Sequence, residues 1–458
     1  TLNSYKKTIN IKLKSALGLD EFQIIERQSG TFINTIDAIH VETITTKELA
    51  KAACCNISES FETNASVDVN ITDAASGTKK IQMLGLDGKY TQIQYENLPL
   101  IRGLSSAYGL TFIPGTQAQS IQVKKGAGSV LNGYESITGQ INLELQKPDE
   151  AEKLYMNIYA NTRSRAEINV QAVQKINDKW STMTMLHASN QTISHDNNND
   201  NFEDHPLRSQ YNLFNRWKYI GKKHMFQGGF RAVLDDLTAG QIVPNINETL
   251  YKIGVNTKQI EVFTKNGILF PHKPYKSIGI INSFKYHEQQ SVYGPKSYDA
   301  TQYSGYLNVI YQTIINNTDH RIKFGGSWAY DNYDKNLNNN YKFGKIESVP
   351  GTFVEYAYND SKKTALVLGL RVDYHNTFGA FITPRAHYKY NFTDKSAFRL
   401  SAGRGLRTAN PIIENTGPAL VTARNVILTD TDLKPEIAWN YGTSVTHIFE
   451  LANKEMNI

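Results

Sequence analysis

The chain has 458 residues, 40% of them hydrophobic, with 26 Tyr, 19 Phe and 31 Gly, and its formal net charge is +6. The charge is mild and forms no basic cluster of the kind that tracks phosphates, which argues against a nucleic-acid-binding protein. No apolar run approaches the roughly 18 residues that a membrane-spanning helix needs, so a soluble protein and a transmembrane β-barrel remain.

The N-terminal region precedes any long series of strands. Residues 8–19, TINIKLKSALGL, alternate in polarity and predict the last strand of a small β-sandwich. Residues 21–31, EFQIIERQSGT, form a short β-prone stretch before a flexible Gln-Ser-Gly. Thr45 and Glu48 then have capping-box spacing, which predicts the start of a short helix.

Cys54 and Cys55 follow at the end of that predicted helix and are the only cysteines. As thiolates they could bind a soft metal such as Cu(I). The alternative is that they are two small, partly buried hydrophobic residues. Adjacent cysteines cannot chelate one ion with ideal geometry, and no His closer than His40 lies near them in sequence. The spacing therefore favours packing over metal binding.

Residues 120–146, SIQVKKGAGSVLNGYESITGQINLELQ, carry the most distinctive pattern in the chain. An alternating strand, a glycine turn, a short Gly/Ser-rich segment and a second alternating strand follow one another. Gly126 breaks the first strand with a residue that can adopt positive φ, and Gly139 begins the second where backbones must approach closely. The pattern consists of Lys125, Gly126, Ser129, Gly133, Ser136, Gly139, Ile141 and Asn142.

After residue 148 the chain becomes a regular series of about fourteen strand-like segments, each of about ten to fourteen residues. In residues 362–374, KKTALVLGLRVDY, the side chains of Leu368 and Leu370 point to one face and those of Arg371 and Asp373 to the other. Charge is thus confined to one side. A soluble β-sandwich would produce the same alternation, so the strands alone do not decide the class.

The connections between these segments alternate between short and long. Short polar turns are predicted near 177–179, 221–222, 271–275, 316–318, 359–361 and 393–394. Long loops are predicted at 190–207, 235–257, 289–300, 332–349 and 405–436. This parity is typical of a transmembrane β-barrel with short periplasmic turns and long outer loops. A sandwich has no reason to keep its long loops at one end.

Two segments resemble TonB-dependent outer-membrane receptors. Residues 120–146 are similar to the end of the plug domain of that family, with I-x-V-x-K-G-x-x-S-x-x-x-G followed by S-x-x-G-x-I-N. Residues 382–415 resemble a barrel segment in which a T-P-R strand precedes L-S-x-G-x-G-x-R-x-x-N and a short helix. Its matching positions are Arg407, Asn410, Glu414 and Asn415. The resemblance covers roughly residues 22–448.

The resemblance implies an all-β transmembrane fold. This is a 22-strand-type antiparallel outer-membrane β-barrel, with about 14 strands present, and an N-terminal α+β plug domain in its lumen. The implied domains are the tail of a periplasmic carboxypeptidase-regulatory-like β-sandwich (1–20), a TonB-box and linker region (21–44), the plug (45–148) and a partial barrel (149–458). Because residues 449–458 look like a periplasmic turn, we expect a fragment that lacks about eight strands.

The resemblance also implies a function, which is active import of a scarce ligand across the outer membrane. The ligand would be an iron-siderophore, cobalamin or metal complex. The TonB complex of the inner membrane would be the energising partner, outer-membrane lipid would surround the barrel, and the plug and N-terminus would lie on the periplasmic side. No cofactor is expected.

Two sets of site residues follow from that likeness. The position of the TonB box, which pairs as an added strand with its partner, corresponds to Phe22, Gln23, Ile24, Ile25, Glu26 and Arg27. The apical plug loops would be 84–90 and 100–117. They offer charge and aromatic surface for ligand contacts at Asp87, Tyr90, Arg102 and Tyr108. Each of these four could equally pack between plug and barrel.

Other functions have weaker support in the residues. The loop 195–206, HDNNNDNFEDHP, could hold Ca²⁺ through its carboxylates and amides, but a hydrated Asn/Asp-rich loop needs no ion. No nucleophile elbow, Walker sequence, zinc-protease motif or paired-carboxylate signature occurs, so an enzyme is not expected. The alternative function is a surface β-rich binding or adhesion protein without transport.

Overall fold

A computed structural model describes residues 31–33, 38–51, 56–61, 64, 66–73, 76–242, 250–422, 433–451 and 454–457. The predicted TonB box (22–27), residues 1–20 and the pair Cys54–Cys55 lie outside these residues. Within the described residues, no helix is long and apolar enough to cross a bilayer.

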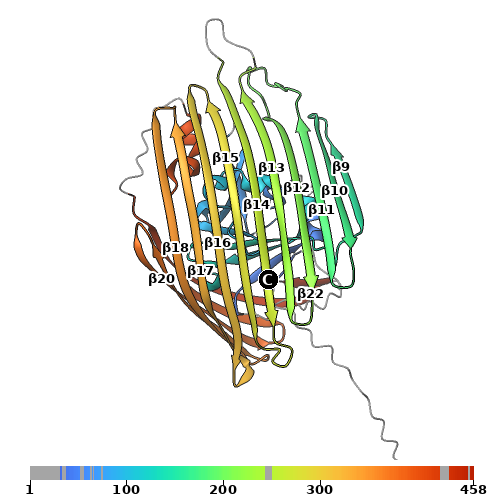
Figure 1. Cartoon of the computed structure of the whole chain (residues 1–458), viewed down its shortest axis with the longest axis vertical. Coiled ribbons are helices and arrows are strands. Elements are labelled where there is room, and N and C mark those ends of the chain that lie inside the picture. Colours follow the sequence, from blue (N-terminus) through green and yellow to red (C-terminus); the bar gives the residue numbers. More distant parts are fainter. Residues whose placement is uncertain are drawn as a thin grey trace, which may run out of the picture.

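One large antiparallel sheet dominates the fold, and its strands pair in chain order (Figure 1). Its members are β9 (Leu154–Ala160), β10 (Arg165–Lys175), β11 (Trp180–Gln191), β12 (Leu207–Ile220), β13 (His224–Gly240), β14 (Lys252–Leu269), β15 (Ser277–Tyr293), β16 (Lys296–Ile315), β17 (Asn317–Leu337), β18 (Tyr341–Asn359), β19 (Thr364–His375), β20 (Gly379–Thr393), β21 (Ser396–Arg407), β22 (Glu436–Leu451) and β23 (Lys454–Asn457). The prediction of about fourteen strands is confirmed by β9 to β22. The short β23 makes the sheet 15-stranded, and its strand order ends at β9 and β23 without closing.

The apolar face of this sheet is exposed and its charged face is buried, which is the reverse of a water-soluble sheet. On β19, Leu370 is 45% exposed, whereas its neighbour Arg371 is 3% exposed. Leu368 and Val372 are likewise exposed, and Asp373 is buried. A soluble sandwich buries its apolar face, but a transmembrane barrel turns that face toward lipid and the polar face inward. The alternation seen in the sequence therefore belongs to a barrel wall, as expected.

Three of the predicted long loops are wrong or too long. Only Gly294 and Pro295 separate β15 from β16, and three residues, Asn338 to Asn340, separate β17 from β18. β13 and β14 also continue into the predicted loop 235–257. The reason is that β16 and β17 have 20 and 21 residues, about twice the 9–11 that cross a bilayer. Beyond the apolar band the outward positions of these strands are polar, as at Asp299, Asp334 and Asn336, so the apolar outer stripe ends there and the sequence resembles a loop.

The remaining connections are as predicted. The six short turns lie at junctions between consecutive strands, although only Asn316 separates β16 from β17, so residues 317–318 of one predicted turn belong to β17. Long connections do follow β11 (192–206) and β21 (408–435). Because the strands are antiparallel and consecutive, all long connections lie at one end of the sheet, together with residues 241–251 after β13. We call this end the long-loop end and the other the short-turn end.

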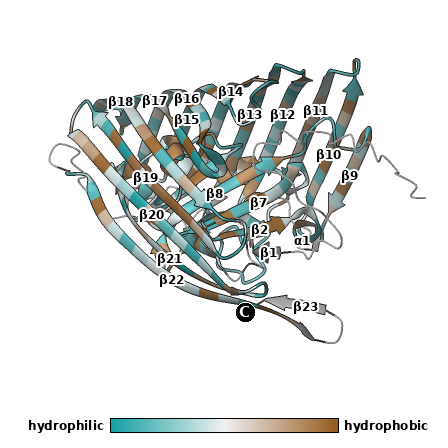
Figure 2. Ribbon diagram, turned by 90° about the horizontal axis from the view of Figure 1, so that it is seen from below, coloured by the Kyte–Doolittle hydropathy of each residue, from teal (hydrophilic) through white to brown (hydrophobic). Residues whose placement is uncertain are grey.

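The N-terminal part of the chain lies in the concave side of the large sheet (Figure 2). It contains a five-stranded sheet, a three-stranded sheet and short helices. The first sheet has the order β1 (Thr31–Ile33), β2 (Val41–Thr45), β7 (Ala118–Lys125), β8 (Gly139–Leu145), β6 (Thr91–Tyr95), and only the β6–β8 pair is parallel. The second consists of β3 (Asp68–Asp73), β4 (Thr78–Met83) and β5 (Leu86–Asp87).

The helices of the N-terminal part are short. They are α1 (Thr46–Lys51), α2 (Ile57–Ser60) and the 3-10 turns η1 (Gly88–Tyr90), η2 (Gly103–Ser106), η3 (Gly109–Phe112), η4 (Gly115–Gln117) and η5 (Val130–Asn132). The helix predicted after Thr45 is thus confirmed as α1. Two more turns belong to the connection after β21: α3 (Pro411–Glu414) and the π-helical turn η6 (Gly417–Val421).

The glycine pattern of residues 120–146 has the predicted geometry. Gly126 ends β7 with φ +78°, and Gly139 begins β8 with φ +155°. A Cβ at Gly139 would lie 2.1 Å from the carbonyl oxygen of Lys124 on the paired strand. A side chain at this position would therefore separate β7 from β8.

Apolar packing joins the N-terminal part to the large sheet, here called the wall, in two places. Ile121, Ile141 and Leu143 belong to one buried cluster with Phe214 and Phe263 of the large sheet. A second cluster lies toward the long-loop end and contains Leu104, Tyr108, Phe112, Tyr293, Tyr298, Ile412, Ile413 and Leu420. Polar contacts between these clusters form the candidate site.

Candidate functional site

A buried carboxylate of the N-terminal part, Glu96, is paired with two cations of the wall. Its oxygens lie 3.2 Å from Nη1 of Arg216 on β12 and 2.8 Å from Nζ of Lys265 on β14. Tyr95 and Leu98 exchange two backbone hydrogen bonds of 2.9 Å around Glu96 and Asn97, both of which have positive φ. This tight turn directs the carboxylate toward the wall.

The charge of Glu96 is stabilised in place. Burial raises its pKa, but the charges of Arg216 and Lys265 and their hydrogen bonds outweigh burial. The resulting pKa lies well below the ordinary value, so Glu96 is ionised at neutral pH. Arg216 is fully buried and also donates to the carbonyl oxygen of Gln146 at 3.0 Å. The group of Glu96, Arg216 and Lys265, here called the anchor, therefore joins strand β12 of the wall to the ends of both β6 and β8.

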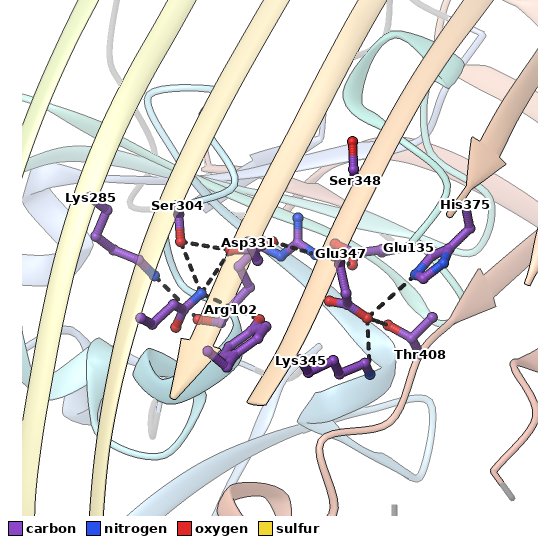
Figure 3. Close-up of polar contacts among 12 residues, drawn as sticks. Arg102, Glu135, Lys285, Ser304, Asp331, Lys345, Glu347, Ser348, His375 and Thr408 are labelled. Atoms are coloured by element: carbon purple, nitrogen blue, oxygen red, sulfur yellow. Dashed lines mark hydrogen bonds and ion pairs between the residues drawn. The ribbon is translucent and has the colours of Figure 1, made fainter. Parts of the chain in front are cut away.

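A second ionic group surrounds Arg102, in the loop before η2 (Figure 3). Its Nη2 lies 3.0 Å from Glu135 of the N-terminal part and 3.2 Å from Asp331 on β17. Burial raises the pKa of Glu135, and the carboxylates of Glu347 and Asp331 raise it further, while Arg102 opposes this. Thus Glu135 and Glu96, two carboxylates of the same part, have pKa values shifted in opposite directions.

The backbone of the Arg102 loop is held by Lys285 on β15 (Figure 3). Its ammonium donates to the carbonyl oxygens of Leu100 at 3.0 Å and Arg102 at 3.3 Å, and to the hydroxyl of Ser105 at 3.0 Å. Gly103 has φ +63°, and a Cβ there would lie 2.6 Å from side-chain atoms on β16 and β17. The loop thus fits closely against the wall.

The Gly/Ser-rich segment of the sequence motif is held in a similar way. Arg385 on β20 donates to the carbonyl oxygens of Ser129 at 2.7 Å and Gly133 at 3.0 Å. The hydroxyl of Ser129 donates to Glu355 at 2.6 Å, and Arg371 donates to Val130 at 3.3 Å. Backbone carbonyl oxygens in and beside η5 therefore accept hydrogen bonds from the arginines of the wall.

A third carboxylate, Glu347 on β18, collects donors from three segments (Figure 3). These are Nζ of Lys345 at 3.0 Å, Nε2 of His375 at 3.4 Å and the hydroxyl of Thr408 at 2.8 Å. Thr408 belongs to the connection after β21. Glu347 thus links that connection to the wall strands beside the Arg102 group.

A cavity of about 110 Å³ lies between the N-terminal part and the wall. Both carboxylates and cations line it, among them Asp87, Arg102, Glu135, Lys345, Glu347 and Arg407. Charged side chains therefore line it from both the N-terminal part and the wall, among apolar residues such as Ile81, Ile93 and Leu110.

The four predicted ligand contacts are not equivalent. Asp87 and Arg102 line the cavity, and Tyr90 lies next to it, with its ring 5.3 Å from the guanidinium of Arg407. Tyr108 is buried in the apolar cluster, with its hydroxyl 3.4 Å from that of Tyr293. Asp87 accepts from the backbone N–H of Lys89 at 3.0 Å. The structure thus brings three of the four together, and ligand binding by any of them stays a prediction.

The other predicted sites have different outcomes. Among the motif residues, Ser129 and Gly133 contact the wall, whereas Gly126 and Gly139 shape the strands. In the loop 195–206 the carboxylate of Asp204 accepts from Asn197, and Asp200 accepts from Asn198 and Phe202. Across the described residues, no group of three or more His, Cys, Asp or Glu could hold a metal ion.

Sequence reasoning missed the wall residues that hold the N-terminal part, above all Arg216, Lys265, Lys285 and Asp331. The available signal was charge at inward positions of alternating strands, as noted for Arg371 and Asp373. That signal identifies which face of a strand points inward, but it does not identify the residue that each charged side chain contacts.

The comparisons with known proteins agree with this architecture. The family model described as TonB dependent receptor-like, beta-barrel, matches residues 87–453. No curated protein matches the sequence.

Among solved structures, the ferripyoverdine receptor of the outer membrane of Pseudomonas aeruginosa, bound to ferripyoverdine, is similar at 12% identity with a TM-score of 0.72, over 93% of this chain and 64% of that one. The FpvAI–pyocin S2 complex is similar at 12% identity with a TM-score of 0.72, over 94% and 63%. The siderophore receptor PirA from Acinetobacter baumannii is similar at 13% identity with a TM-score of 0.68, over 89% and 68%. These likenesses show the fold. The chain spans less than two thirds of the first two structures.

Proposed function

The chain belongs to the TonB-dependent receptor family, and on this premise we propose that it imports a scarce small-molecule or metal-complex ligand across the outer membrane. The N-terminal part acts as the plug, with residues 45–148 as its extent and 149–458 as the barrel. The long-loop end faces the outside and receives the ligand. Residues 21–44 face the periplasm and carry the box that binds the TonB complex.

One observation carries this proposal: charged and hydrogen-bonded contacts, in addition to apolar packing, hold the plug to the wall. The groups around Glu96, Arg102 and Ser129 join different parts of the plug to different wall strands. When such an interface separates, water can form hydrogen bonds with the groups that lose their partners. An apolar interface gains no such bonds when it is exposed to water. The wall strands, in contrast, are held by continuous backbone ladders. The plug can therefore move while the barrel stays intact.

The ligand class follows from the neighbours only as a proposal. One similar structure holds ferripyoverdine and another is named a siderophore receptor. Ferric siderophores are therefore the first ligands to test, before cobalamin and other metal complexes.

Deleting the receptor is expected to abolish uptake of one iron complex while leaving the others unchanged. The measurement is cell-associated radioactive iron, presented on a panel of catecholate, hydroxamate and mixed siderophores. Cobalamin is tested in parallel. Intact receptor supplied in trans should restore uptake, and so should Asp178→Asn, which changes only an exposed residue of a short turn. Unchanged uptake of every compound, together with weaker cell adhesion, would instead support a binding protein without transport.

The proposed orientation predicts which ends of the strands are accessible from outside. In the intact receptor with Cys54 and Cys55 replaced by serine, cysteines at Asn198 and Asn338 should react with an impermeant maleimide on whole cells. Cysteines at Asp178, Lys222 and Asp394, which are equally exposed but lie at the short-turn end, should react only after the cells are broken. The reverse pattern would overturn the topology, and uniform labelling would argue against a membrane barrel.

A further inference from the structure

The described part of the connection after β21 is packed onto the rest of the molecule. Residues 408–422, here called the strap, contain two compact turns, α3 and η6, at the long-loop end beside the ends of β17 and β18 (Figure 1). The backbone N–H of Asn410 donates to Glu414 at 2.7 Å, and the amide of Asn415 donates to Pro411 at 2.8 Å. Pro411 stands in the first turn of α3, where a missing N–H costs nothing. The strap is thus locally ordered by its own sequence.

Wall lysines hold the strap by its polar oxygens. Lys296 donates to the carbonyl oxygens of Ala419 at 3.3 Å and Thr422 at 2.6 Å. Lys345 donates to Ala409 at 3.2 Å, and Lys335 donates to the side-chain oxygen of Asn410 at 2.7 Å. Most of these acceptors are neutral carbonyl oxygens, so each bond can be exchanged for a bond to water without leaving a buried carboxylate unpaired. At these points the strap is held by hydrogen bonds to its neutral oxygens.

The strap is also attached to the plug. Nζ of Lys80, on β4, donates to the carbonyl oxygen of Glu414 at 2.6 Å. Ile412, Ile413 and Leu420 are buried in the same apolar cluster as Leu104 and Tyr108 of the plug. The strap therefore contacts the plug and the wall at the same time.

The strap covers the cavity described above. Four of its residues line that space, which are Thr408, Ala409, Asn410 and Glu414, and Arg407 at the end of β21 lines it as well. The plug residue Ser106 lines it from the other side. Thr408 also donates to Glu347, which lies beside the Arg102–Glu135 pair (Figure 3). A displacement of the strap would thus open the cavity and remove donors from both sides of it.

We propose that the strap is a cover that couples the long-loop end to the plug. In the closed state it shields the cavity and fixes β4 through Lys80. When it is displaced, its buried side chains leave together, so the change is a switch between two arrangements. This inference concerns regulation of the proposed import site and rests on that function. Because coupling is reciprocal, loosening the plug contact must open the strap, and loosening the strap must expose the plug.

The first test measures how often the strap opens when its plug contact is removed. Ala419, which is buried, is replaced by cysteine in intact receptor that lacks Cys54 and Cys55, and the rate of maleimide labelling is measured in detergent. Lys80→Met should raise this rate about ten-fold, the effect expected for losing a hydrogen bond to a charged donor. Lys80→Arg keeps a donor and should restore most of the protection. Lys80→Leu, which also lacks a donor, gives the same comparison if Lys80→Met does not fold.

Lys89→Met is the matched control, because Lys89 lines the same cavity and its ammonium lies over the ring of Tyr90 at 5.4 Å. It removes the same charge and should change the labelling rate less than two-fold. Equal rates in Lys80→Met and Lys89→Met would show that the strap is not coupled to the plug.

The second test runs in the opposite direction. With a cysteine at Ser106 in the same background, Lys296→Met should speed labelling of the plug because it loosens the wall end of the strap. Lys342→Met, an exposed lysine at the start of β18, should not. Faster labelling at Ala419→Cys without any change at Ser106→Cys would mean that the strap does not cover the cavity. Neither rate depends on import, so a normal response with failed uptake would count against the proposed function and not against the strap.

Discussion

Proline at Ile24 or Ile25 should abolish uptake while ligand binding at the long-loop end survives. If residues 22–27 are the TonB box, they supply backbone hydrogen bonds to a partner strand. Proline removes an N–H donor and fixes φ, so the strand cannot pair. The measurements are accumulation of the radioactive iron complex by energised cells and its binding to cells without an energy source. Accumulation should fall to the level of the deletion strain, whereas binding should stay within about two-fold of the unmodified receptor.

Alanine at the same two positions is the control, because it keeps the donor and should leave most of the uptake. Uptake that survives both proline substitutions would place the box elsewhere, with 32–44 as the next segment to test. Binding that falls together with uptake would mean that residues 22–27 are folded into the plug.

Arg216→Met should destabilise the plug within the barrel by about 3–5 kcal/mol, because it leaves the carboxylate of Glu96 buried with one cation fewer. The same change removes the bond to the carbonyl oxygen of Gln146. The measurement is hydrogen exchange of β7 and β8 amides at increasing urea concentration, which reports the free energy of opening of these strands. A loss below about 1 kcal/mol would show that Lys265 alone satisfies Glu96.

Lys218→Met provides the matched control for this substitution. Lys218 lies two residues further along β12, on the same face, and its Nζ pairs with Asp149 at 2.6 Å. The side chain of Asp149 is 29% exposed, against 1% for Glu96. A pair with one exposed member should contribute only about 1 kcal/mol or less. The difference between the two variants therefore compares a fully buried cation, with its ion pair and its bond to Gln146, with a pair that has one partly exposed member.

The anchor should also depend on pH in a defined direction. The pKa of Glu96 is lower in the folded protein than its ordinary value. Its contribution to stability is therefore present above that ordinary value and is lost as the pH falls through the folded value. The stability gap between the unmodified receptor and Glu96→Gln should be largest at neutral pH and should shrink below about pH 4.5. A gap that stays constant down to pH 3 would contradict the proposed ionisation.

Which segments are strands, and which face of each strand is apolar, could be predicted from the residues alone. Side chains alternate with a period of two, so Leu370 and Arg371 must point to opposite faces wherever the strand lies. The glycine turn at Gly126 and the start of β8 at Gly139 could also be predicted, because these positions demand backbone conformations or close approaches that other residues resist. The two family motifs depend on such local requirements. That is why fold class and family could be predicted without coordinates.

The full length of the strands and the partners of the inward charges depend on long-range contacts in the folded chain. The ends of β16 and β17 lie beyond the apolar band, where polar outward residues resemble a loop, so cross-strand pairing alone reveals them as strands. Glu96 meets Arg216 across 120 residues of sequence, and Lys80 meets Glu414 across 334. Local pattern contains no information about such partners, because they are brought together by the curvature of the sheet around the plug. The candidate site is made of these distant pairs, so its residue types could be expected from the sequence but its contacts could not.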